Sequence, residues 1–201
     1  MRTVYVNGQY VPENEAKVSI FDRGFTFADG VYEVTTVIGG KLCDYDGHMK
    51  RLQRSLKELQ IDFNTTEEDL LVMHRELVKR NNVDEGWVYM QITRGEDDRD
   101  FVFPPAGTPT TMVAFTQAKP LVDNPRAAAG VSVYCVDDKR WGRCDIKTVQ
   151  LLYPSLAKME AKKNGAGDAW FVKDGYVTEG ASNNAYIVTQ DGTIERASFH
   201  L

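Results

Sequence analysis

The sequence is poor in the residues that would build a disulfide framework or a metal site. Its 201 residues include three histidines and three cysteines, and Cys43, Cys135 and Cys144 stand far apart with no Cys-x-x-Cys pair among them. An odd number of isolated cysteines is typical of reduced thiols, and so few soft ligands give little support to a bound metal. We therefore expect neither a disulfide nor a metal.

The sequence also lacks clustered basic charge and long apolar runs. The formal net charge is −5, and the lysines and arginines are spread along the chain, which argues against nucleic acid as a partner. No apolar run approaches the ~20 residues of a membrane-spanning helix. The first eight residues have the pattern of a strand and a turn rather than of a signal peptide. These features predict a cytoplasmic protein with no membrane partner.

Hydrophobic periodicity predicts an α+β fold, with a small first domain over residues 1–119. Asn7-Gly8 lies between two short apolar runs and predicts a hairpin turn. Thr66 precedes three acidic residues and is typical of a helix N-cap. Apolar spacing predicts helices over 48–60 and from Thr66 onward, and strands over 31–38, 87–93 and 111–116. The side chains expected to face inward from the second helix are Leu70, Leu71, His74, Leu77 and Val78.

The second half of the chain predicts a linker followed by a sheet-rich domain. Two prolines and three alanines over 120–130 indicate a short interdomain linker. Residues 131–201 then predict a helix over 155–163 that ends at Asn164-Gly165, with hairpin turns at Asp174-Gly175 and Asp191-Gly192. The predicted strands are 131–136, 144–146, 169–172, 176–178 and 186–188.

A lysine and a glutamate stand at the ends of two of these short apolar segments. Lys147 closes the run Arg143-Cys144-Asp145-Ile146-Lys147, and Glu179 follows Val177-Thr178. A lysine amine can form a Schiff base with an aldehyde, and a carboxylate can pair with a protonated pyridine nitrogen. In their flanking sequences, the two residues indicate a pyridoxal 5'-phosphate site.

Several sequence blocks occur in an order that is typical of one enzyme family. The blocks are Asp22-Arg23-Gly24, residues 27–34, residues 48–52, Thr93-Arg94-Gly95, residues 143–147 and residues 177–184. With these blocks the chain resembles the class IV pyridoxal-phosphate aminotransferases, and among them the D-amino acid aminotransferases. This resemblance implies the fold-type IV architecture, with a small N-terminal α/β domain and a sheet-rich, pseudo-barrel C-terminal domain.

The resemblance implies a role for four residues in holding the cofactor. Lys147 matches the Schiff-base lysine, whose free amine later moves a proton between the substrate Cα and the cofactor. Glu179 matches the carboxylate at the pyridine nitrogen, and Ser182 lies in the cofactor-binding block that follows. Arg51 matches the phosphate-binding arginine, although its place among other basic residues of a helix is equally typical of a solvated side chain.

The resemblance also implies that Tyr32 and Arg99 hold the substrate carboxylate. Both residues have a structural alternative, because Tyr32 lies in an alternating strand and Arg99 lies among acidic residues that suit a surface ion-pair patch. We expect Arg143 to pair with Asp145, and His48 and His74 to be structural. Phe101 replaces the histidine that D-amino acid aminotransferases carry two positions after the arginine, and an apolar ring cannot donate to a carboxylate.

The resemblance implies transamination of D-amino acids, of the type in which D-alanine and 2-oxoglutarate give pyruvate and D-glutamate, and it implies a homodimer. The alternatives are an R-selective amine transaminase, which Phe101 would permit, an aminodeoxychorismate-lyase-like enzyme, and a truncated inactive remnant. The family pattern continues beyond Leu201 through further loops around the cofactor phosphate. We therefore expect the C-terminal domain of this sequence to be incomplete, with weak cofactor binding and poor solubility, unless the sequence is a fragment of a longer reading frame.

Overall fold

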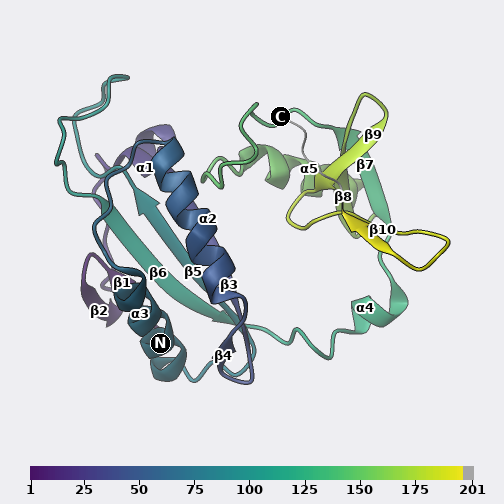
Figure 1. The fold of residues 1–201 in the computed structure, drawn as a ribbon, viewed down its shortest axis with the longest axis horizontal. Helices are drawn as coiled ribbons and strands as arrows, with labels where there is room; N and C mark the ends of the chain where they lie inside the picture. Colours follow the sequence, from purple (N-terminus) through teal and green to yellow (C-terminus); the bar gives the residue numbers. More distant parts are fainter. Residues whose placement is uncertain (197–201) are drawn as a thin grey trace. The chain divides into compact units, whose positions relative to one another are not determined.

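The computed structural model describes residues 1–196, and its contacts divide the chain into two compact units. Unit 1 comprises Met1–Asp123 together with Ile146–Val149, and unit 2 comprises Asn124–Asp145 and the chain from Gln150. Each unit contains both helices and strands (Figure 1), which confirms the predicted α+β class. The domain limits of 1–119 and 131–201 remain predictions. The sequence analysis did not predict that Ile146–Val149 belongs to unit 1.

Unit 1 is built on a six-stranded antiparallel sheet that packs against two helices (Figure 1). The strand order is β2-β1-β6-β5-β3-β4. The strands are β1 (Thr3–Val6), β2 (Gln9–Pro12), β3 (Gly30–Ile38), β4 (Lys41–Leu42), β5 (Gly86–Thr93) and β6 (Thr111–Ala118), and the helices are α1 (Arg23–Phe27), α2 (Tyr45–Glu58) and α3 (Glu67–Arg80).

Local sequence explains most of these elements. Asn7 and Gly8 adopt positive φ angles of 45° and 92°, as the predicted two-residue hairpin turn requires. The Thr66 hydroxyl accepts a hydrogen bond from the amide of Asp69 at 3.1 Å, which confirms the predicted N-cap of α3. In α3 the inward positions are as predicted except that Met73 is buried and Leu71 only partly so.

The core of unit 1 lies between α2, α3 and one face of the sheet. Alternate residues of β3 and β5 are buried on this face, and each pairs across the two strands, as Val31 does with Ile92. The odd-numbered positions of β3 therefore point toward the helices, while the even-numbered positions, including Tyr32, point to the opposite face. This alternation decides which residues of β3 are available to a site.

Unit 2 has a three-stranded sheet and a separate hairpin. The strands β7 (Val133–Asp137) and β8 (Asp168–Lys173) are parallel, and β9 (Tyr176–Gly180) pairs with β8 in the antiparallel direction. Helix α5 (Leu152–Lys163) packs on this sheet, where Ala157, Ala161 and Phe171 are buried. The hairpin consists of β10 (Tyr186–Val188) and β11 (Ile194–Arg196). No helix in residues 1–196 is long and apolar enough to cross a membrane.

One prediction for residues 120–146 was wrong. The predicted strand over 144–146 is absent; these residues form a turn. Residues 147–149, just after this turn, pair with β3 instead. The sequence analysis missed this pairing because β3 is remote in sequence, and local pattern does not identify a remote partner. The linker over 120–130 stays a prediction, and it contains a short helix, α4 (Pro125–Ala129), which Asn124 caps and in which proline takes the first position.

Candidate active site

Lys147 is held against the outer edge of β3 in unit 1. The amide of Tyr32 donates to the Lys147 carbonyl at 3.0 Å, and the amide of Val149 donates to the Gly30 carbonyl at 3.2 Å. The Lys147 amide also approaches the hydroxyl of buried Ser55 on α2, at 3.5 Å. Backbone pairing thus fixes the position of Lys147, although the residue lies outside the named strands.

The amine of Lys147 meets the side chain of Tyr32. Its Nζ atom donates to the Tyr32 hydroxyl at 3.1 Å and lies 4.3 Å from the centre of the ring. Both side chains are half-buried. Among the described residues, no carboxylate pairs with this amine. Two residues that the sequence assigned to one site are therefore in direct contact.

Arg51 is paired with Glu33, a residue that the sequence analysis did not select. Arg51 donates from Nε to Oε1 at 2.7 Å and from Nη2 to Oε2 at 2.6 Å, and His48 Nδ1 lies 2.7 Å from Oε2. Burial of Glu33 opposes its ionisation, but the hydrogen bonds from Arg51 and His48 outweigh it and lower the pKa of the carboxyl. A carboxylate at an inward position of a strand requires such partners. The inward position of Glu33 in the predicted strand was therefore the feature of the sequence that could have identified it.

Arg99 lies in the exposed loop between β5 and β6. Its guanidinium is 5.3 Å from the ring centre of Phe27 and 5.4 Å from that of Phe101. Within residues 1–196, Arg99 forms no ion pair with the neighbouring aspartates, so the alternative of a surface ion-pair patch is not observed. The Phe101 side chain is 78% exposed.

In unit 2, Glu179 on β9 belongs to a cluster of charged residues. Arg140 donates to Glu179 and, through Nε and Nη2, to both oxygens of Asp138 at 2.9 and 2.7 Å. Asp138 also accepts from the Thr178 hydroxyl at 2.7 Å. Burial opposes ionisation of Asp138, but these hydrogen bonds outweigh it and lower the pKa of its carboxyl. The Glu179 carboxylate is thus held by a cation that stays charged.

Two other residues from the sequence blocks that carry the family resemblance also lie in unit 2. Ser182 is exposed in the turn that follows β9. Arg143 pairs with Asp145 through two hydrogen bonds of 2.9 Å, which confirms the predicted pair. The exposed side chain of Ser182 is therefore accessible to a ligand, whereas Arg143 has the structural contact that its sequence position suggested.

The chemistry of these side chains fits pyridoxal phosphate. Lys147 offers an amine that no described carboxylate neutralises, Glu179 offers a fixed carboxylate for a ring nitrogen, and Arg51 offers a planar cation that is 42% exposed and can face a phosphate. No group of three or more His, Cys, Asp or Glu residues among the described part of the chain is arranged to hold a metal ion.

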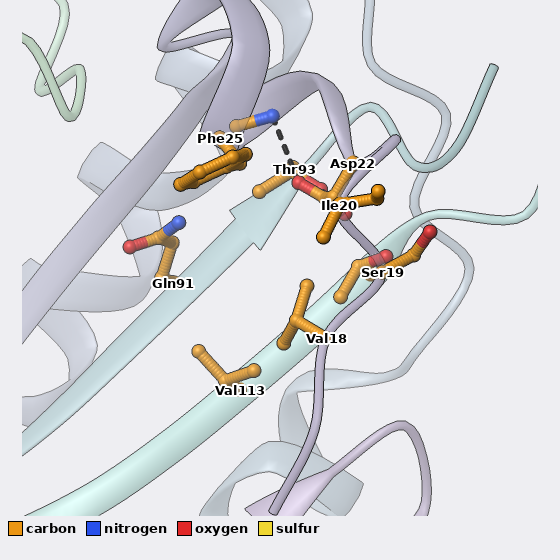
Figure 2. Close-up of a pocket in the computed structure, with 10 residues that line it drawn as sticks. Val18, Ser19, Ile20, Asp22, Phe25, Gln91, Thr93 and Val113 are labelled. Atoms are coloured by element: carbon orange, nitrogen blue, oxygen red, sulfur yellow. Dashed lines mark hydrogen bonds between the residues drawn. The ribbon is translucent and has the colours of Figure 1, made fainter. Parts of the chain in front are cut away.

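An apolar groove in unit 1 lies apart from these residues. Its volume is about 350 Å³, and Figure 2 shows Val18 and Ile20 on one side of it and Phe25 and Gln91 on the other. None of the predicted site residues lines this groove. The side chains of Ile20 and Phe25 are 69% and 78% exposed, so the groove is an open surface feature.

Comparison with known proteins identifies the family. Residues 30–199 match the family model described as amino-transferase class IV. The chain belongs to this family. It is 41% identical over 196 residues to a D-alanine aminotransferase of Staphylococcus haemolyticus, a match that covers 96% of this chain and 68% of the relative. It is 39% identical over 189 residues to a D-alanine aminotransferase of Bacillus licheniformis, with 94% and 66% covered.

Solved structures of the class IV fold agree with the architecture. A branched-chain amino acid aminotransferase of Escherichia coli matches with a TM-score of 0.80 at 21% identity, over 96% of this chain and 66% of that chain. One of Thermoproteus uzoniensis, solved with norvaline, gives 0.78 at 24% identity, over 96% and 67%. These likenesses establish the fold-type IV architecture. The chain spans about two thirds of the length of the relatives it matches.

Proposed function

We propose that the chain carries the cofactor-binding lysine and part of the substrate site of a pyridoxal-phosphate-dependent D-amino acid aminotransferase. The proposed reaction moves the amino group of a D-amino acid such as D-alanine to a 2-oxo acid such as 2-oxoglutarate. The observation that carries the proposal is the contact between Lys147 Nζ and the Tyr32 hydroxyl, at 3.1 Å. The identity of about 40% to proteins named D-alanine aminotransferase supports the choice of substrate class.

The proposed role of Lys147 is first to hold the cofactor and then to move a proton. Two hydrogen bonds to β3, one to the Lys147 carbonyl and one from the Val149 amide, fix the backbone of residues 147–149, so the amine is presented from a rigid edge rather than from a mobile loop. Once a substrate amine has displaced Lys147 from the cofactor, its free Nζ would accept a proton from a substrate carbon and return it. The Tyr32 hydroxyl, at hydrogen-bonding distance from Nζ, would orient the amine for this transfer.

The cofactor, when bound, would supply an electron sink that stabilises negative charge on the substrate carbon. We assign Arg51 to its phosphate and Glu179 to its ring nitrogen. Glu33 would keep Arg51 in place, since two hydrogen bonds fix the plane of the guanidinium. Arg140 and Asp138 would keep the Glu179 carboxylate oriented. Ser182 is assigned to the cofactor by resemblance alone.

Arg99 is the proposed partner of the substrate carboxylate. Its guanidinium is exposed, rests on two phenylalanine rings and is not paired with the nearby aspartates in the described structure, so it can pair with a carboxylate from outside. The exposed ring of Phe101 beside it adds no donor. Activity toward D-alanine compared with activity toward a substrate without a carboxylate, such as an R-configured amine, therefore tests this assignment.

The experiment is a visible absorbance spectrum of the purified chain after addition of pyridoxal phosphate. We expect a protein-bound cofactor band that D-alanine bleaches in the wild-type chain and that Lys147→Ala lacks. Lys50→Ala, which removes an exposed lysine of α2, is the matched control and should behave as wild type. A band that survives in Lys147→Ala would refute the assigned role, and bleaching by an R-amine but not by D-alanine would replace the substrate class.

We further propose a homodimer, as the family resemblance implies. Size-exclusion chromatography with light scattering tests it, and a monomeric mass at micromolar concentration would contradict it.

A further inference from the structure

Asp29 lies between two arginines in the interior of unit 1. Its Oδ2 atom accepts hydrogen bonds from Arg23 Nε at 2.8 Å and Arg94 Nε at 2.7 Å, and its Oδ1 atom accepts one from Arg94 Nη2 at 3.0 Å. The side chains of Asp29, Arg23 and Arg94 are 10%, 3% and 8% exposed. Two buried cations share one carboxylate, and each has further hydrogen-bond donors that need acceptors.

Each arginine uses its remaining donors to hold a different segment. Arg94 donates to the carbonyls of Leu59 and Gln60, at 2.7 and 2.8 Å, just after the end of α2, where a cation is favoured. Arg23 donates from Nη1 to the carbonyl of Asp100 at 2.7 Å. Asp29 therefore connects the end of α2 to the loop between β5 and β6.

The loop over residues 97–103 contacts these arginines through the ring of Phe103, and indirectly through the ring of Phe27 on α1. The Phe103 ring centre is 3.6 Å from the Arg94 guanidinium carbon, and the Phe27 ring, 4.4 Å from that of Arg23, makes an edge contact with Phe101 at 5.5 Å. The Arg99 guanidinium lies over the Phe27 and Phe101 rings. The rings that contact Arg99 are therefore packed in turn against the buried guanidinium of Arg23, through Phe27.

We propose that Arg23, fixed by Asp29, is a positioning residue that holds loop 97–103 and thereby sets where Arg99 meets a substrate carboxylate. The part that concerns the substrate rests on the proposed function. The part that concerns the loop rests on the contacts of unit 1 and is testable without cofactor. Exposed Phe101, Val102 and Phe103 also give this loop sites for a protease that cuts before large apolar residues.

The first test compares wild type with Arg23→Met by limited thermolysin digestion of the full chain. Methionine keeps an unbranched side chain and leaves Asp29 paired with Arg94, so the buried charge stays balanced, but it removes the donor to the Asp100 carbonyl. We expect cleavage at residues 100–103 to become about tenfold faster, as the loss of a charge-assisted hydrogen bond implies. An unchanged rate would overturn the proposal.

A matched control is Arg80→Met. Arg80 is also in unit 1, where it pairs with Glu76 at 2.6 Å and lies 4.3 Å from the ring centre of Tyr10, and both partners are outside the loop. Its loop cleavage should equal that of wild type. If Arg23→Met does not fold, Arg23→Lys keeps the charge beside Asp29 and should give a smaller acceleration; wild-type loop cleavage in that variant would again overturn the proposal.

The second test separates positioning from a general loss of structure. In Arg23→Met we expect the KM for D-alanine to rise about tenfold with kcat unchanged, while an amine without a carboxylate keeps its wild-type KM. A loosened loop with an unchanged KM for D-alanine would overturn the positioning role. If the wild-type chain itself shows no transamination, the proposed function fails, whereas the thermolysin result still decides whether Arg23 holds the loop.

Discussion

Acidification is expected to destabilise unit 1 through His74. This side chain is fully buried on α3, its Nδ1 atom donates to the Leu70 carbonyl at 2.7 Å, and its Nε2 atom has no hydrogen-bond partner in the described structure. The other ionisable groups around it are Tyr45, whose ring makes an edge contact at 5.4 Å, and His48. Within residues 1–196, no carboxylate is hydrogen-bonded to the His74 ring to stabilise its protonated form.

Burial lowers the pKa of His74 from 6.5 to about 4, and electrostatic repulsion between the His74 and His48 rings adds to this, against the opposite effect of the Leu70 carbonyl. As the pH falls, the unfolded chain takes up a proton first, so stability that is fully present above pH 6.5 is lost between pH 6.5 and 4. At about 1.4 kcal/mol per pH unit, the complete loss is about 3 kcal/mol. About 2 kcal/mol of it is lost between pH 8 and pH 5.

The assay is urea unfolding at pH 8 and pH 5 for the wild type and for His74→Leu. Trp87 is the tryptophan of unit 1, so Trp141→Phe and Trp170→Phe in both proteins make the fluorescence report on unit 1. We expect the wild type to lose about 2 kcal/mol more than the leucine variant over this interval. Because each protein is compared with itself, the packing change at position 74 cancels.

An equal loss of stability in both proteins would refute the reasoning. It would mean that the folded chain accommodates a protonated imidazole at position 74, and that the lowered pKa does not describe the folded state. A larger loss in the leucine variant would refute it in the same way, because leucine has no proton to bind.

Two further substitutions test the interior of unit 1 by urea unfolding at neutral pH. Glu33→Gln removes the buried charge that faces Arg51 and should cost about 2 kcal/mol, less than the ~3–5 kcal/mol of a fully buried pair because Arg51 is 42% exposed and can be rehydrated; an unchanged stability would show that the pair contributes nothing. Asn81→Ala should cost about 3 kcal/mol, because Asn81 bonds the amide and carbonyl of Thr3 and the buried hydroxyl of Thr116. A loss well under 1 kcal/mol would mean that these groups find other partners.

Local pattern was sufficient for much of the fold. The positive φ angles of Asn7 and Gly8, the N-cap at Thr66 and the alternation along β3 all follow from preferences of neighbouring residues. The ordered sequence blocks were likewise sufficient for the family, which the match over residues 30–199 confirms. Such features depend on contacts within a few residues, and they can therefore be predicted from the sequence.

The tertiary structure alone decided how the site is assembled in unit 1. Lys147 reaches Tyr32 across 115 positions of sequence because residues 147–149 pair with the edge of β3, and no local pattern specifies that partner. Glu33 and Asp29 are likewise paired with arginines because both carboxylates are buried, and the sequence alone does not show that burial. The sequence determined which residue types were present and their local conformation, whereas long-range pairing and the cost of burying charge determined which of them came together.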